Sequence, residues 1–242
     1  MIRQALRLPA ARMIARKISK GWNDAMPAIK TLKKFFPMML ALVLALTLCG
    51  CNLVENTASP TADPDSPHPV ATITMENGDV MRAELYPEYA PNTVANFIEL
   101  ANSGFYDGIS FHRIVKGFVI QAGLASTAGK ADVGYTIKGE MGNNGFKQNT
   151  LKHTKGVLSM ARVSGDYDSG STQFFIVVAD APDYLDDEYA PFGKLMDDDS
   201  IAVAEKMSKV AVDSTDKPIN SQTIATIRVE TNGQEYTAEK IK

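Results

Sequence analysis

The feature that most constrains this chain is the stretch from Phe111 to Gly123, which contains two short apolar segments separated by a turn. Residues 111–114 and 118–121 have the length and composition of β-strands, and Lys116-Gly117 supplies the turn. The stretch therefore predicts a β-hairpin.

Three side chains of this hairpin point to a binding site. Arg113, Phe118 and Gln121 can converge on one concave face, where a cation, an apolar floor and an amide suit a neutral, carbonyl-rich ligand such as a peptide. The same segment is compatible with a core hairpin whose arginine faces solvent. The residues of the hairpin alone leave both interpretations open.

The pattern of short strands continues through the chain from Val70. Asn77-Gly78 lies between two alternating segments, which is a strong hairpin signal. Gly-rich turns and only two helical stretches indicate a mainly β domain, a closed or nearly closed antiparallel barrel. The expected strands are 70–75, 80–86, 156–161, 173–178, 192–195 and 223–230, and the expected helices are 91–101 and 201–210.

Charge divides the chain into two unlike parts. Residues 1–51 carry a net charge of +8, whereas residues 52–242 carry −11. Nonspecific nucleic-acid binding requires a basic surface that displaces counterions. The acidic body therefore argues against nucleic acid as a partner.

The basic segment 1–51 is interpreted as an N-terminal extension with a signal peptide. Three lysines precede the uncharged run 35–48, and Leu48-Cys49-Gly50-Cys51 follows. A helix of that run would span about 21 Å, less than the roughly 30 Å hydrocarbon core of a bilayer. The ending resembles the lipobox of bacterial lipoproteins. That resemblance implies a lipidated Cys51 and an extracytoplasmic protein anchored to the bacterial cell membrane; an ordinary signal with a chance cysteine is the alternative.

The mature chain is expected to hold one domain. Residues 52–69 are rich in Pro, Ser and Thr and predict an extended linker. The domain follows at 70–232, with a C-terminal tail at 233–242. Both cysteines lie at the signal boundary, so the domain has no disulfide and no thiol nucleophile.

Other chemistries find little support in the sequence. The histidines lack a second ligand at metal spacing, so we expect no metal, and no phosphate-binding glycine motif indicates a cofactor. No Ser is set up next to a plausible His, and Gly-x-Ser-x-Gly is absent. We expect the acidic runs 186–188 and 197–199 to be solvated turns.

Three ordered motifs remain. They are Phe-His-Arg-Ile-x-x-Gly-Phe-x-x-Gln-x-Gly from 111, Lys-His-Thr-x-Gly-x-Leu-Ser-Met-Ala from 152 and Ser-x-Gln-Phe-Phe-Ile from 171. Together they resemble the cyclophilin family of peptidyl-prolyl isomerases, over about Val70 to Glu230. The resemblance implies a mainly β fold: a closed, antiparallel, eight-stranded barrel capped by two α-helices.

The resemblance also implies site residues. It assigns the catalytic group to Arg113, Phe118 and Gln121, with Arg113 donating to the prolyl nitrogen. The substrate-binding positions that it implies are His112, Val119, Met160, Ala161, Arg162, Gln173, Phe175, Tyr184, Leu185 and Tyr189.

The chain departs from the family pattern at three of these positions. Tyr184 stands where the family often has Trp, which leaves cyclosporin sensitivity open, and Tyr189 stands where many members have His. Arg162 replaces a common Asn, but we expect that contact to be made largely through the backbone.

These features predict a monomeric, lipid-anchored prolyl isomerase that acts on unfolded or exported proline-containing polypeptides without a cofactor. The alternatives are a catalytically weak holdase or adaptor lipoprotein that binds proline peptides, and a purely structural surface lipoprotein. An isomerase assay separates the first two.

Overall fold

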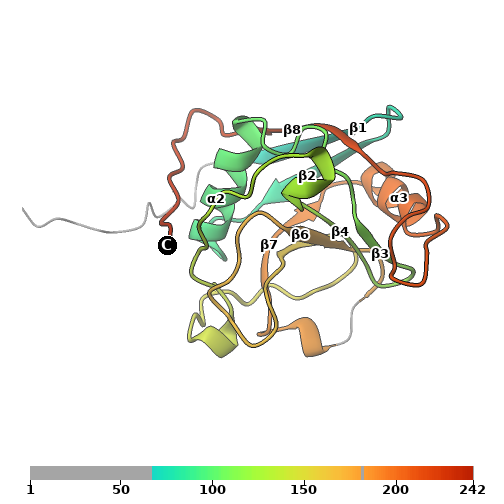
Figure 1. The fold of residues 1–242 in the computed structure, drawn as a ribbon. Helices are drawn as coiled ribbons and strands as arrows, with labels where there is room; N and C mark the ends of the chain where they lie inside the picture. The colour runs from blue at the N-terminus through green and yellow to red at the C-terminus, as the bar shows by residue number, and fades with distance from the viewer. Residues whose placement is uncertain (1–66, 181–182, 242) are drawn as a thin grey trace, which may run out of the picture. The chain divides into compact units, whose positions relative to one another are not determined.

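The computed structural model describes residues 67–180 and 183–241 (Figure 1). Its two α-helices are α2 (Pro91–Asn102) and α3 (Asp198–Met207), and its 3-10 helices are η1 (Ala125–Ala128), η2 (Gly142–Asn144) and η3 (Asp183–Leu185). The strands are β1 (Val70–Met75), β2 (Val80–Leu85), β3 (Arg113–Val115), β4 (Val119–Ala122), β5 (Val157–Met160), β6 (Phe174–Val177), β7 (Ala190–Leu195) and β8 (Ile224–Glu230). The fold is therefore mainly β, as predicted.

Within this part of the chain the eight strands form one antiparallel sheet in the order β3-β4-β6-β5-β7-β2-β1-β8. The edge strands β3 and β8 share no ladder; the isolated bridge between Ser110 and Thr223 lies beside them. One cause is visible at β3, where the Ile114 N–H donates to the Asp216 carbonyl in a loop. The predicted closure of the barrel is therefore not confirmed, and the sheet is an open half-barrel.

The main core lies on the inner face of the sheet. Apolar residues alternate with more exposed ones along β1 and β2, as expected for strands with one buried face. Helix α2 packs against β8 and β7, and α3 packs against β2 (Figure 1). The fully buried Phe97 of α2 contacts the rings of Tyr106, Phe174 and Phe192 at centroid distances of 5.1–5.3 Å.

Each helix begins where a carboxylate accepts its free N–H groups. Helix α2 has Ala90 at its N-cap, which offers no side-chain acceptor, and the buried Glu140 carboxylate accepts from the N–H groups of Asn92 and Thr93 instead. Asp197 caps α3 by accepting from the Ser200 N–H at 2.7 Å. This cap explains why α3 begins at 198 rather than at the predicted 201. Residues 197–199 are exposed, as expected, but 198 and 199 lie in the first turn of α3 rather than in a loop turn.

A close backbone crossing fixes the end of β4. Gly123 has φ +95°, and a Cβ at this position would lie 2.2 Å from the Thr172 carbonyl oxygen. The Thr172 hydroxyl donates to the Gly123 carbonyl at 2.9 Å. Only glycine meets both requirements, so this residue links β4 to the segment that leads into β6.

The C-terminal residues run beside α2. Glu239 N–H donates to the Asn92 side chain, and Lys240 pairs with Glu99 at 2.6 Å. Neither α2 nor α3, the α-helices of the described residues, is long and apolar enough to cross a membrane. The predicted signal peptide, Cys51 and linker residues 52–66 lie outside the residues that the structure describes.

Candidate functional site

Two of the predicted catalytic residues, Arg113 and Gln121, lie in one row across the outer face of the sheet. Arg113 on β3 is opposite Gln121 on β4, Gln121 is opposite Phe175 on β6, and Phe175 is opposite Ser159 on β5. Residues in register on neighbouring strands project to the same side. The hairpin thus brings a cation, an amide and an aromatic ring together, away from the main core.

These side chains border a cavity of about 430 Å³. A small apolar cluster that is separate from the main core forms its floor, including Val119, Phe175 and Leu185, which are all at most 5 % exposed. The cavity is lined by Arg113, Phe118, Val119, Gln121, Ala161, Arg162, Ser164, Phe175, Tyr184, Leu185, Glu188 and Tyr189.

Aromatic rings form the rim of the cavity. Phe118 and Tyr184 approach to 6.1 Å between centroids, and Tyr184 is 61 % exposed. Tyr189 meets Phe175 edge-on at 5.4 Å. The cavity therefore has an apolar floor, an aromatic rim and one exposed cation, which suits an apolar ring attached to a polar backbone.

Arg113 keeps most of its hydrogen-bonding capacity free. Its side chain is 42 % exposed and pairs with Asp216 at 3.5 Å, and Asp216 is similarly exposed. Such a pair between exposed groups is weak. The guanidinium is therefore available to a ligand in the cavity.

Two predicted residues support the site from the side. Gln173 accepts a hydrogen bond at 3.0 Å from the Gln121 amide and also bonds to His112. Burial lowers the pKa of His112, and the charge of Arg113 lowers it further, against the effect of the Gln173 bond. A neutral, half-buried imidazole is a packed neighbour of Arg113 rather than a general base.

The structure does not bring Met160 into the cavity. Alternation along β5 turns Met160 to the face opposite Ser159, where it packs in a cluster with Ile137, Met141 and Ala190. It thus supports the wall from behind. The expectation that Met160 lies beside the ring pocket is not met by its position, because one residue along a strand reverses the face.

A buried hydrogen-bonded chain that the sequence analysis missed lies behind the floor. The His153 imidazole contacts Asp186 through Nδ1 and Ser159 Oγ through Nε2, both at 2.9 Å. The expectations of no Ser beside a His and of a solvated Asp186 were therefore wrong. Ser159 is fully buried and His153 is 3 % exposed, so these hydrogen-bonded side chains cannot reach a substrate. They instead connect β5 to the loop after η3.

The Arg162 side chain has internal contacts that the sequence analysis did not foresee, whereas the expected backbone contact with a substrate stays a prediction. The side chain is 7 % exposed and pairs with Glu188, a cavity-lining residue that the sequence analysis did not single out. Glu188 lies in the acidic run expected to be solvated, and no local sequence signal connects it to a residue 26 positions earlier.

The chain matches known proteins over the region that forms this site. Residues 70–229 match the family described as cyclophilin type peptidyl-prolyl cis-trans isomerase/CLD. Peptidyl-prolyl cis-trans isomerase B of Bacillus subtilis is 46 % identical over 121 residues, covering 50 % of this chain and 79 % of the relative. The peptidyl-prolyl cis-trans isomerase of Helicobacter pylori is 37 % identical over 139 residues, covering 57 % and 80 %.

Solved structures agree with the sequence relatives. A cyclophilin-type peptidyl-prolyl cis-trans isomerase of Cryptosporidium parvum, solved in the presence of the dipeptide Ala-Pro, superposes with a TM-score of 0.57 at 30 % identity. The match covers 67 % of this chain and 99 % of that one. The family match, the relatives and the fold lead to the same conclusion: this chain belongs to the cyclophilin-type peptidyl-prolyl cis-trans isomerase family.

Proposed function

We propose that this chain is a peptidyl-prolyl cis-trans isomerase that accelerates rotation about X–Pro bonds in folding or exported polypeptides. The observation that carries the activity is the position of Arg113, exposed and weakly paired, at the edge of a cavity floored by Phe175 and Leu185. The family of the chain and the Ala-Pro dipeptide of its structural relative support the same reaction.

The reaction requires no covalent chemistry. Amide resonance opposes rotation with a barrier of about 18–20 kcal/mol, and uncatalysed X–Pro exchange takes tens to hundreds of seconds. Millisecond exchange requires an acceleration of about 10⁵-fold, or roughly 7 kcal/mol off the barrier. A site that holds the two ends of a peptide and stabilises the twisted amide can supply this.

Arg113 is the group that would stabilise the twisted state. As the X–Pro bond rotates, resonance is lost and the prolyl nitrogen regains a lone pair that can accept a hydrogen bond. A guanidinium is charged at every physiological pH, and its bond to that nitrogen exists only while the amide is twisted. Such an interaction lowers the barrier, because it is stronger in the transition state than in the ground state.

The remaining residues would hold the peptide. The ring of proline fits the apolar floor of Phe175 and Leu185 under the rim of Phe118, where burial of apolar surface favours binding. The Gln121 amide, oriented by Gln173, is placed to hold the peptide backbone.

A protease-coupled assay on a short X-Pro peptide tests the activity. We expect catalysed isomerisation at nanomolar to micromolar protein. Tight peptide binding without any turnover at micromolar protein would contradict the enzyme and would favour the alternative, a proline-peptide-binding holdase or adaptor lipoprotein.

We further propose that the protein acts outside the cytoplasm as a monomer anchored by a lipid on Cys51. The basic start, the uncharged run 35–48 and the Leu-x-Gly-Cys ending of the signal support this location. Mass spectrometry of the mature protein tests it: a diacylated N-terminal Cys51 is expected. An unmodified cysteine, or a mature chain that begins elsewhere, would refute the anchor.

A further inference from the structure

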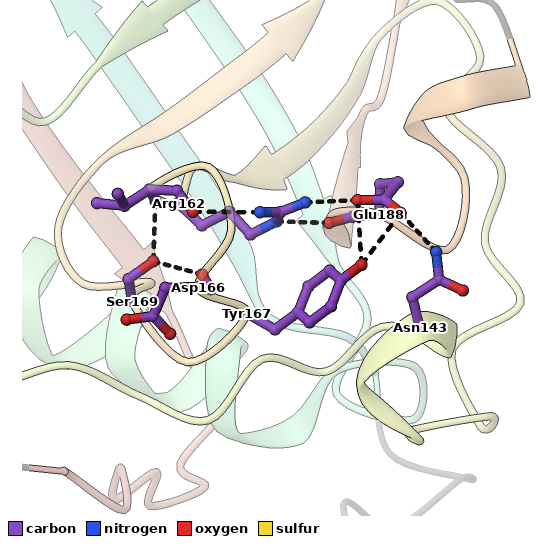
Figure 2. Close-up of polar contacts among 7 residues, drawn as sticks. Asn143, Arg162, Asp166, Tyr167, Ser169 and Glu188 are labelled. Carbon is purple, nitrogen blue, oxygen red and sulfur yellow. Dashed lines mark hydrogen bonds and ion pairs between the residues drawn. The ribbon is translucent and has the colours of Figure 1, made fainter.

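Arg162 and Glu188 form the most connected polar contact at the cavity. Arg162 Nε donates to the Glu188 carbonyl at 2.8 Å, Nη2 donates to the Glu188 carboxylate, and Nη1 donates to the Val163 carbonyl at 3.1 Å. Figure 2 shows the carboxylate also meeting the Tyr167 hydroxyl and the Asn143 amide. One carboxylate therefore joins η2, the loop after β5 and the loop after η3.

The guanidinium also fixes two aromatic rings. Its Cζ lies 4.6 Å from the centroid of Tyr167 and 4.9 Å from that of Tyr189, distances at which a cation is attracted to a ring face. Tyr189 in turn meets Phe175 on the cavity floor at 5.4 Å. A continuous line of contacts thus runs from Arg162 through Tyr189 to the surface on which a proline ring would rest.

Arg162 borders two cavities, and Glu188 borders the first of them. Arg162 lines both the cavity with Phe118 and Phe175 and a second cavity of about 410 Å³ bordered by Asp132, Tyr135 and Gln173. A peptide whose proline ring fills the first cavity and whose backbone runs toward the second must pass over the wall that Arg162 forms between them. The charge on the wall therefore acts on residues that flank the proline.

We propose that Arg162 and Glu188 are positioning residues that hold Tyr189 against Phe175 and, by cancelling each other's charge, let the groove accept either charge beside proline. The inference rests on the proposed isomerase function. Because the Arg162 side chain is almost fully buried, its charge is poorly screened by solvent. Glu188 is the acid that neutralises it.

The test measures kcat and KM for wild type and Glu188→Gln on X-Pro peptides in which X is Ala, Glu or Lys. Wild type is expected to treat Glu and Lys within about threefold of each other. Glu188→Gln is expected to raise KM for the Ala peptide about three- to tenfold with kcat nearly unchanged, and to shift the preference toward Glu over Lys about fivefold.

Glu76→Gln is the matched control, because it removes the same charge from an exposed turn residue. It should leave KM and the charge preference unaltered. Arg162→Ala should also raise KM, without a shift toward Glu. The double variant Arg162→Ala/Glu188→Ala should lose less peptide affinity, read as KM, than the sum of the losses of the two single alanine variants.

The outcomes distinguish the inference from the function on which it rests. A wild-type protein without turnover would overturn the isomerase itself. An active wild type whose Glu188→Gln variant keeps the wild-type KM and charge preference would overturn the inference alone. If the Arg162–Glu188 pair had a purely structural role, Glu188→Gln would lower thermal stability and leave the Glu-to-Lys preference unchanged. That result would also overturn the proposal.

Discussion

Two arginines border the same cavity and are used in opposite ways. Arg113 is 42 % exposed and makes one 3.5 Å ion-pair contact, whereas Arg162 is 7 % exposed and donates three hydrogen bonds while lying between two rings. The difference shows which charge is free to react. A guanidinium that donates to a lone pair present only in the twisted amide needs N–H groups that are free of other hydrogen bonds. A guanidinium that holds the side of a cavity in place needs N–H groups that are already hydrogen-bonded.

The first prediction tests the reactive side of this comparison. Arg113→Lys keeps the charge but loses the planar fork of donors, so we expect kcat to fall by about 10- to 100-fold with no change in the melting temperature. Steady-state kinetics and thermal unfolding on the same samples measure both. A kcat within twofold of wild type would show that charge alone suffices.

The second prediction tests the structural side. Arg162→Ala leaves Glu188 and the two tyrosine rings on either side of the guanidinium without their cation, so the free energy of unfolding should fall by about 2–3 kcal/mol. Arg113→Ala should change it by less than about 0.5 kcal/mol, because its pair is exposed. Urea titrations decide this, and equal losses for the two variants would erase the distinction.

The third prediction concerns the buried wall behind both arginines. Burial lowers the pKa of His153 below its usual 6.5, and the bonds from Asp186 only partly oppose this. The unfolded chain therefore binds the proton more readily than the folded protein does. The contribution of the neutral His153 to the free energy of unfolding is therefore complete above about pH 6.5 and is lost as the pH falls below that value. Denaturant titrations of His153→Gln should show a flatter pH dependence, with a residual slope from His112; an unchanged slope would contradict the assignment.

The smallest effect is expected at the partner of the reactive arginine. Asp216 has φ +64°, and Asn tolerates that left-handed backbone, so Asp216→Asn removes the charge without disturbing the turn. We expect kcat/KM to change by less than about threefold, because the pair is long and exposed. A tenfold loss of kcat/KM would mean that Arg113 depends on Asp216 for its position, as Arg162 depends on Glu188, and would contradict the contrast between the two arginines.

The sequence predicted those parts of the site that depend on local pattern. Alternation and turn residues located the 111–123 hairpin, and the structure adds its register, in which Arg113 is opposite Gln121. It also located α2, whose Pro91 and Gly104 mark its ends well.

The rest depends on contacts between residues distant in the chain. Glu140 caps α2, Asp186 binds His153 and Glu188 binds Arg162, and none of these acids carries a local signal for its partner. Met160 was misplaced because the face of a strand residue depends on register. The expected barrel closure fails where a loop carbonyl, rather than β8, accepts from β3.

The central claim is that Arg113 acts on the twisted amide and contributes little to holding the ground-state peptide. The most direct test is NMR exchange spectroscopy on an X-Pro peptide bound to wild type and to Arg113→Ala. The account predicts that the variant binds the peptide with a Kd within about threefold of wild type while catalysed cis-trans exchange falls by at least about 100-fold. Equal losses in affinity and in exchange would contradict it.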